Sequence, residues 1–252
     1  MGNIFFKHLK LLKGPIYTKI NKFPTFTLVS SIFRDSWYNF IVPSVSDNEF
    51  NWELSEGLIQ KGNKNAIKFP YYIKDNFIQN YKDRLVKLGY KTLGDNTYML
   101  LVMKKKFGIN GENIKEIQEK QAGAYIKIAQ SCFPEFETEE QNCRRFLNLS
   151  RANTNKDLTI SNLSLTINRK IAAFASLYSS KKLNLAYLHN DGTAEEFRRK
   201  GFHKMLIQKR CNMAFDFGIK NIYAILEEGG ASFYSYSKLG FKPIAKYTLF
   251  SK

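Results

Sequence analysis

Between residues 158 and 250, the spacing of apolar residues changes repeatedly between that of a strand and that of a helix. Alternating apolar residues predict strands over residues 158–167, 171–178, 183–189, 221–227 and 241–250, the last as one strand or two. Apolar residues three and four positions apart predict helices over residues 113–132, 138–149, 202–217 and 232–239. From residue 111 onward the expected order is therefore α, α, β, β, β, α, β, α, β.

The N-terminal part of the chain has a second, looser set of elements. Strands are expected over residues 25–30, 39–43, 66–73 and 98–103. Helices are expected over residues 4–13, 47–59 and 75–88, with Asp47 and Asp75 as N-caps and Gly89 as the stop. The polar, glycine-containing residues 104–111 then mark a boundary. We expect two domains, residues 1–107 and residues 108–252.

Residues 193–204 are the stretch with the clearest chemistry, because a predicted strand is followed there by a basic turn and a helix. The first turn of a helix offers unpaired backbone N–H groups and the positive end of the helix dipole, which together bind phosphate. Gly201 would let the backbone approach a phosphate, and Arg198, Arg199 and Lys200 add positive charge. Taken alone, the stretch also fits a polar turn with i,i+4 charge pairs.

Two short motifs resemble the signatures of the GNAT family of N-acetyltransferases. Arg198-Arg-Lys-Gly-Phe-His203 resembles the family's Arg/Gln-x-x-Gly-x-Gly/Ala motif, and Tyr236-Ser-Lys-Leu-Gly-Phe241 resembles its second signature. The element order after residue 111 also resembles that of the family. The resemblance implies an α/β (α+β) GNAT fold, in which helices flank a mixed, mostly antiparallel twisted sheet.

The resemblance further implies acetyl-CoA as cosubstrate. The end of the third predicted strand would pair with the pantetheine arm through main-chain groups, and the basic turn would hold the pyrophosphate. Ser232 is expected to hydrogen-bond the cofactor or to cap a helix, and His203 departs from the family's Gly or Ala. The expected CoA-binding residues are Asp191, Gly192, Thr193, Arg198, Arg199, Lys200, Gly201, Phe202, His203, Lys204 and Ser232.

For catalysis, Tyr236 matches the family's tyrosine that protonates the departing thiolate, although an ordinary core tyrosine would fit the same pattern. The family's glutamate on the fourth strand corresponds to Ala224, so the nearest candidate base is Glu227, followed by Glu228. Both glutamates also fit solvated turn residues. The expected function is transfer of an acetyl group from acetyl-CoA to a primary amine by direct attack in a ternary complex. Because alanine stands at position 224 in place of this glutamate, a non-catalytic acyl-CoA-binding or interaction module is an alternative function.

The N-terminal half contains a short segment that is similar to the second signature. Lys87-Leu-Gly-Tyr90 resembles Lys238-Leu-Gly-Phe241, which suggests a tandem pair with a smaller, degenerate GNAT-like first domain. The counterpart of Tyr236 would be Leu85, which cannot protonate a thiolate. Residues 1–107 are therefore expected to support the second domain rather than to bind CoA.

The amino-acid composition and the net charge indicate which classes of partner the protein could bind. The net charge is +17, but the lysines are spread along the chain, which favours a solvated surface over nucleic acid and leaves an RNA-associated acceptor as a lesser alternative. Cys132, Cys143 and Cys211 are odd in number and lack metal-ligand spacing, so free thiols and no metal site are expected. No apolar run is long enough to span a membrane. These features predict a cytoplasmic protein. The primary amine that the resemblance implies as acceptor would belong to a small molecule or a protein; neither the acceptor nor the oligomeric state has a readable motif.

Overall fold

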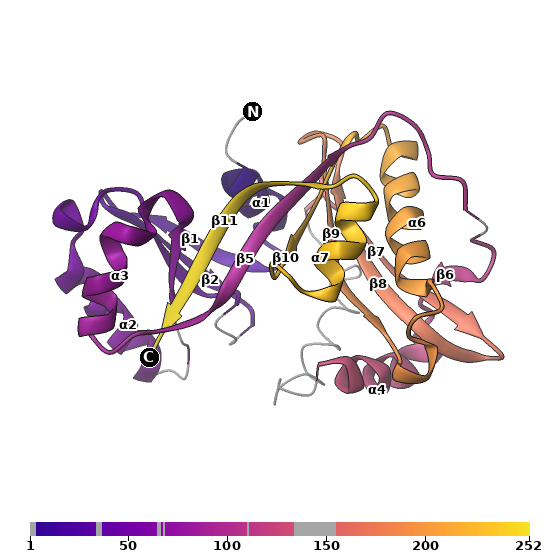
Figure 1. The fold of residues 1–252 in the computed structure, drawn as a ribbon, viewed down its shortest axis with the longest axis horizontal. Coiled ribbons are helices and arrows are strands. Elements are labelled where there is room, and N and C mark those ends of the chain that lie inside the picture. Colours follow the sequence, from indigo (N-terminus) through magenta and orange to yellow (C-terminus); the bar gives the residue numbers. More distant parts are fainter. Residues whose placement is uncertain (1–3, 34–36, 65–66, 68, 110, 134–154) are drawn as a thin grey trace. The chain divides into compact units, whose positions relative to one another are not determined.

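The helices and strands of the protein follow one another in an order that is used twice along the chain (Figure 1). The structure is a computed structural model that describes all residues except 1–3, 34–36, 65–66, 68, 110 and 134–154. The chain forms two compact units. Unit 1 comprises Met1–Tyr98, Leu226–Phe233 and Pro243–Lys252, and unit 2 comprises Met99–Ile225 and Tyr234–Lys242.

Unit 2 contains most of the expected site residues. Its strands are β6 (Ile114–Glu116), β7 (Thr159–Ile167), β8 (Lys170–Ser180), β9 (Leu185–Thr193) and β10 (Asn221–Leu226). Their spatial order is β10-β9-β8-β7-β6, and β9 pairs with β10 in parallel while β6 to β9 pair antiparallel. The expected mixed, mostly antiparallel sheet is confirmed.

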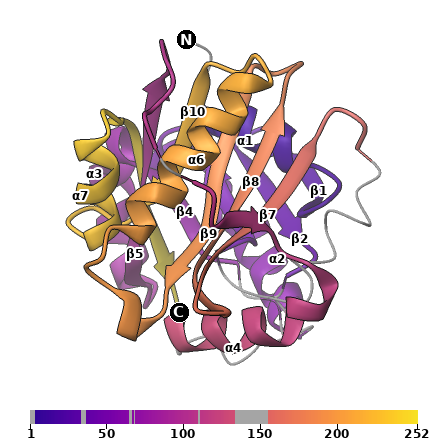
Figure 2. The same cartoon turned by 90° about the vertical axis from the view of Figure 1, so that its right-hand side faces the viewer.

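Two helices cover opposite faces of the sheet in unit 2 (Figure 2). Helix α6 (Phe202–Asp216) places Leu206 against Ala173 and Ala175 of β8. Helix α4 (Ala122–Cys132) packs on Phe174, which lies between these alanines in sequence. Because successive residues of a strand point to opposite faces, the small residues of β8 meet α6 and the large ring meets α4.

The β7–β8 hairpin forms as its sequence predicts. Asn168 and Arg169 connect the strands with φ angles of 48° and 65°. Two central residues with positive φ are typical of the type I′ turn, whose twist matches that of a hairpin. The pairing shifts by one residue between Thr166 and Leu165, and beyond this irregularity Leu163 faces Ala175.

Unit 1 is built from the first half of the chain together with one late strand. Its helices are α1 (Ile4–Leu12), α2 (Trp52–Lys64) and α3 (Ile78–Lys87). Its strands are β1 (Tyr17–Lys22), β2 (Phe26–Ser31), β3 (Phe40–Pro43), β4 (Tyr71–Lys74), the first part of β5 (Lys91–Val102) and β11 (Lys242–Ser251). The strands run in the order β1-β2-β3-β4-β11, and β11 lies antiparallel to β4.

The order α, β, β, β, α, β, α, β occurs in both halves. Among the described residues it is α1-β1-β2-β3-α2-β4-α3-β5 in the first half and α4-β7-β8-β9-α6-β10-α7-β11 in the second, where α7 is Ala231–Lys238. Residues 134–154, between α4 and β7, lie outside this comparison. Each final strand takes part in the other unit, because β11 joins unit 1 and Met99–Val102 of β5 belongs to unit 2. The repeated order supports a duplication, and the limits at residues 107 and 108 stay a prediction.

Several local expectations need correction. Asp47 does not cap α2, because its carboxylate accepts the indole N–H of Trp52; the Asn51 side chain instead accepts the N–H of Leu54 at 3.0 Å. Asp75 begins a 3₁₀ turn, and α3 follows without a side-chain cap. Gly89 does end its helix, with φ of 84°.

The helix predicted over residues 113–132 is wrong in its first part. Residues 114–116 form β6, which pairs with Leu163–Leu165 of β7, and the helix begins only at Ala122. The helix predicted over residues 138–149 lies outside the described residues. Within the described part of the chain, no helix is long and apolar enough to cross a membrane.

Candidate functional site

Strand β9 contains a bulge where the site begins. The pairing of β8 with β9 shifts by one residue just before Gly192, and Asn190 adopts a left-handed conformation with φ of 51°. The Asn190 side-chain amide donates a hydrogen bond to the hydroxyl of Tyr125 in α4 at 2.6 Å. A bulge redirects the side chains that follow it. The next residue, Asp191, directs its carboxylate to Arg210 of α6.

The side chains packed around position 192 leave no space for a Cβ, so this position requires glycine. A Cβ at this position would lie 2.7 Å from the Phe174 ring and 2.9 Å from the Cys132 sulfur. Gly192 therefore allows the side chains of Phe174 and Cys132 to pack against β9 on the α4 face, and its role in CoA binding stays a prediction.

The predicted turn between β9 and α6 has the geometry of an anion site. Arg199 and Gly201 have φ angles of 63° and 82°, and α6 starts at Phe202. The first backbone bond within the helix runs from Met205 N–H to the Gly201 carbonyl at 3.1 Å. No side chain caps this end of α6 in the described chain, so the N–H groups of residues 202–204 are available to a ligand.

The basic side chains of the turn have different surroundings. Arg198 donates from Nε to the Thr193 carbonyl at 3.3 Å. Lys200 places its ammonium 5.1 Å from the centre of the Phe197 ring. Arg199 is exposed. Arg199 is therefore the member of the group that can reach a phosphate without first leaving another contact within the described structure.

Behind the start of α6 lies a cluster in which three side chains donate to one carboxylate oxygen of a fourth. Asp191 Oδ2 accepts hydrogen bonds from Arg210 Nη2 at 2.5 Å, from Tyr236 Oη at 2.9 Å and from His203 Nε2 at 3.1 Å. His203 therefore turns toward Asp191, which accounts for a ring where the family has Gly or Ala. The structure thus joins three of the predicted residues in one network.

Arg210 is the residue that sequence reasoning missed. Its side chain is fully buried, and it donates to the carbonyls of Ser176 at 3.0 Å and His189 at 3.3 Å in addition to Asp191. A second contact of Nη2 reaches Tyr236 Oη at 3.2 Å. A sequence signal exists, because Arg210 interrupts the apolar face of α6 and a buried arginine needs a paired anion.

The cluster perturbs the acidity of its members. Burial opposes the charge of Asp191, but the Arg210 guanidinium and His203 hold the pKa of its carboxyl well below the usual range. Burial raises the pKa of Tyr236 well above its usual value; Arg210 opposes that rise and Asp191 adds to it. The resting state is therefore a carboxylate and a protonated tyrosine.

His189 lies on the other face of the β9 end. Its ring stacks on Tyr187 with 4.9 Å between ring centres, and Nδ1 lies 3.0 Å from the Tyr187 hydroxyl. Burial, reinforced by Arg210 and opposed by Asp191, lowers the pKa of His189 to about 4. The imidazole is therefore neutral at neutral pH and able to accept a proton.

Glu227 and Ser232 are the two predicted residues that belong to unit 1. Glu227 is exposed after the end of β10, and its carbonyl accepts the N–H of Gly230 at 3.3 Å. Ser232 is partly exposed in the first turn of α7. Ala224, at the place of the family glutamate, is fully buried. The roles of Glu227 and Ser232 stay predictions.

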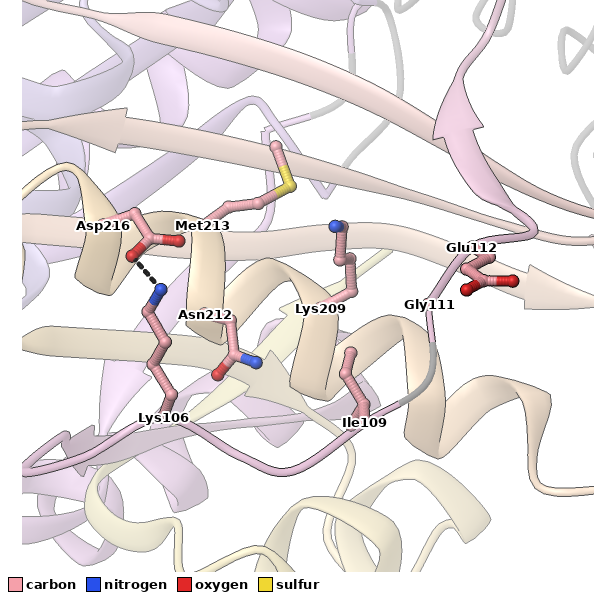
Figure 3. A pocket seen from close by; sticks show the side chains of 8 residues that line it. All are labelled: Lys106, Ile109, Gly111, Glu112, Lys209, Asn212, Met213 and Asp216. Atoms are coloured by element: carbon pink, nitrogen blue, oxygen red, sulfur yellow. Dashed lines mark ion pairs between the residues drawn. The ribbon is translucent and has the colours of Figure 1, made fainter.

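A pocket of about 390 Å³ lies beside α6 and contains none of the predicted residues (Figure 3). Asn212 fixes its wall by bonding both the N–H and the carbonyl of Phe107, at 2.8 and 2.9 Å. Lys106 and Asp216 form an ion pair across one side of it. Its lining residues are Lys106, Ile109, Gly111, Glu112, Lys209, Asn212, Met213 and Asp216.

Comparison with known proteins finds a match to one family model over part of the chain. Residues 124–241 match the model of the acetyltransferase (GNAT) family. The fold resembles a GCN5-related N-acetyltransferase from Sphaerobacter thermophilus, with 12% identity, a TM-score of 0.66, and coverage of 98% of this chain and 84% of that one. It also resembles a GCN5-related N-acetyltransferase from Kribbella flavida, with 13% identity, a TM-score of 0.61, and coverage of 93% and 89%.

A tandem GNAT protein from the clavulanic acid biosynthesis pathway has the same fold over most of the chain. It is 8% identical, with a TM-score of 0.60 and coverage of 90% of this chain and 78% of that one. No curated protein matches this sequence. At these identities the structural likeness establishes the fold alone.

Proposed function

Because residues 124–241 match the model of the acetyltransferase (GNAT) family, we propose that the protein transfers an acetyl group from acetyl-CoA to a primary amine. The amine attacks the thioester directly while donor and acceptor are both bound. The observation that carries the donor assignment is the uncapped start of α6 behind the basic turn and Gly201. It suits the pyrophosphate of CoA, because backbone N–H groups and the helix dipole favour a doubly charged anion there.

The end of β9 supports the same assignment. Thr193 Oγ1 is buried and has no hydrogen-bond partner among the described residues, which a bound pantetheine arm would supply. The main chain of residues 191–193 would pair with the amide groups of that arm. Arg199 would meet the phosphates from the exposed side of the turn.

For proton transfer, Tyr236 is the proposed acid for the departing thiolate. Its side chain is fully buried and its hydroxyl donates to Asp191, so acting as acid requires the hydroxyl to turn toward the thioester. Glu227 and the neutral His189 are the two candidates for the group that takes the proton of the amine. The free thiols of Cys132 and Cys211 support a reducing, cytoplasmic setting.

The donor site is tested by Arg199→Glu. Reversing this charge should weaken acetyl-CoA binding about tenfold or more, measured as Kd by calorimetry. The matched control is Arg169→Glu, because Arg169 is also exposed, also has positive φ and carries the same charge. Equal values of Kd for the two variants would show that the start of α6 does not bind the phosphates of acetyl-CoA.

The reaction is tested by CoA release with a panel of primary amines. Wild type should release CoA in an amine-dependent manner, and Tyr236→Phe should reduce kcat by about a hundredfold with little change in KM for acetyl-CoA. Equal turnover in both proteins would show that Tyr236 is not the acid.

A non-catalytic acyl-CoA-binding module is the second candidate. The observation that favours it is the burial of Tyr236 with its hydroxyl already bonded to Asp191. It predicts CoA binding in calorimetry without turnover of any amine. An acceptor carried on RNA is a third candidate, and a steep salt dependence of RNA binding would distinguish it.

A further inference from the structure

The cluster around Asp191 connects His203, at the start of α6, to Tyr236 through two consecutive side-chain contacts that share Asp191 Oδ2. We propose that Asp191 and Arg210 are positioning residues for the Tyr236 hydroxyl: Asp191 holds its oxygen beside Arg210, and Arg210 stabilises the phenolate left when the proton has moved to the thiolate. This inference rests on the proposed acetyl transfer. It assigns roles to the side chains of Asp191 and Arg210, which the proposed function leaves without one.

Asp191 is suited to orient the hydroxyl because one oxygen receives all three donors. Oδ2 lies 2.9 Å from Tyr236 Oη, and Arg210 and His203 hold the carboxylate from the α6 side. A tyrosine hydroxyl rotates about its C–O bond unless an acceptor fixes it. In the resting site Asp191 therefore holds the hydroxyl next to Arg210, and only the O–H bond has to turn toward the thioester for Tyr236 to act as the acid.

Arg210 is suited to stabilise a phenolate because its guanidinium cannot move away. It bonds the carbonyls of Leu206 at 3.2 Å, Ser176 and His189, and it has no exposed surface. Its Nη2 lies 3.2 Å from Tyr236 Oη before any charge develops there. A cation fixed in advance in a water-poor site lowers the cost of a developing negative charge.

The proton step balances within these groups. The Tyr236 O–H bond breaks and an S–H bond forms on the departing thiolate of CoA. The negative charge then rests on Tyr236 Oη beside Arg210. A proton from solvent restores the hydroxyl, and the proton lost by the attacking amine leaves to its base.

The groups that face the Tyr236 hydroxyl come from two elements besides α7. Asp191 comes from β9, and Arg210, His203 and Cys211 come from α6. Asp191 raises the pKa of Tyr236 and Arg210 lowers it. Removing the charge of Asp191 should therefore bring the ionisation of Tyr236 to lower pH, while Arg210 remains to stabilise the phenolate.

The test combines Asp191→Asn and Arg210→Lys with a matched control. Asp191→Asn keeps the shape of the side chain and loses the charge; Arg210→Lys keeps the charge and loses the fork that bonds Tyr236 and the two carbonyls. Each should lower kcat on the order of tenfold or more while KM and Kd for acetyl-CoA stay within about twofold. Glu196→Gln, which removes an exposed carboxylate from the turn of the same unit, should leave kcat unchanged.

The pH profile separates positioning from a merely structural role. In Asp191→Asn, kcat should fall at alkaline pH, at the same pH at which one additional tyrosine ionises in an ultraviolet titration. The added ionisation should vanish in Asp191→Asn/Tyr236→Phe. Calorimetric binding of acetyl-CoA serves as the control that each variant is folded. If Asp191→Asn does not fold, the fall of kcat in Arg210→Lys is the measurement that decides.

Two outcomes overturn the proposal in different ways. Turnover by wild type with unchanged kcat in both variants, or an alkaline fall that does not follow the tyrosine titration, removes the positioning role and leaves the acetyltransferase. Acetyl-CoA binding by wild type without turnover of any amine removes the proposed function and this role with it.

Discussion

Gly192 has no room for a side chain. Alanine at this position would bring a Cβ within 3 Å of Phe174 and Cys132, so the ring or the strand would have to move. Gly192→Ala should lower the free energy of unfolding by roughly 1–3 kcal/mol in urea denaturation. Gly123→Ala is the control: it lies in α4 with open space around it, and alanine there should stabilise by about 0.5–1 kcal/mol. The same sign for both would contradict the packing argument.

His189 should give stability a pH dependence of known sign. Burial lowers the pKa of His189 to about 4 in the folded protein, whereas an unfolded histidine titrates near about 6.5. The unfolded state therefore binds the proton first, and the free energy of unfolding should fall as the pH is lowered from about 6.5 to about 4.

The variant His189→Gln, which carries no proton in this range, should show a shallower pH dependence in urea titrations at several pH values. Parallel curves for wild type and variant would show that the environment of His189 does not favour the neutral ring.

Among single residues, those whose role depends on the local backbone could be predicted from the sequence. The start of α6 after Gly201 could be predicted, because glycine readily adopts the positive φ of 82° found there; the phosphate contact of the basic turn stays a prediction. Arg210 could not be assigned, since its partners Asp191 and Tyr236 are distant in sequence and only the fold brings them together. His203 was recognised as unusual, but its bond to Asp191 depends on the bulge at Asn190.

At the scale of elements, helix ends show how far a short motif can be interpreted. Helices α3, α6 and α7 all end with a positive-φ glycine, at Gly89, Gly218 and Gly240, followed by a backbone bond that closes the last turn. This is the Schellman arrangement, which glycine favours in any helix. The likeness of residues 87–90 to residues 238–241 thus reflects helix-end chemistry, and the repeated element order is the stronger support for duplication.

The error over residues 113–132 also belongs to this scale. Residues 114–116 are too few for their spacing to distinguish a strand from a helix, and their pairing with β7 decides the outcome. Long elements with internal consistency, such as β8 and α6, were predicted within a few residues.

The β7–β8 turn offers a stabilising substitution. Arg169 has φ of 65°, a conformation that costs an L-residue roughly 1 kcal/mol and costs glycine little. Arg169→Gly would create Asn-Gly, the pair most favoured in type I′ turns, and should raise the free energy of unfolding by about 0.5–1 kcal/mol. Lys170→Gly, one residue later in β8, should lower it, because glycine weakens a strand. A loss of stability in Arg169→Gly would show that the turn is not strained.

For the whole molecule, β11 makes the stability of unit 1 depend on residues far along the chain. Leu249 in β11 pairs with Tyr72 of β4 and is fully buried, whereas Ile244 in the same strand is 43% exposed. Leu249→Ala should cost about 2–5 kcal/mol and speed hydrogen exchange at the amides of β4. Ile244→Ala should change stability by less than about 1 kcal/mol. Unchanged exchange in β4 after Leu249→Ala would show that β11 does not stabilise unit 1.

The place of β11 in unit 1 also sets an order of events during protein synthesis. A ribosome completes residues 1–98 long before it reaches residues 243–252. Until β11 has been synthesised, β4 lacks the strand that pairs with it in the folded protein. Unpaired edges are where nascent chains associate with one another. Slowing translation between these two regions should therefore lower the yield of folded protein, and cutting the gene between its two halves should leave neither product with a complete sheet.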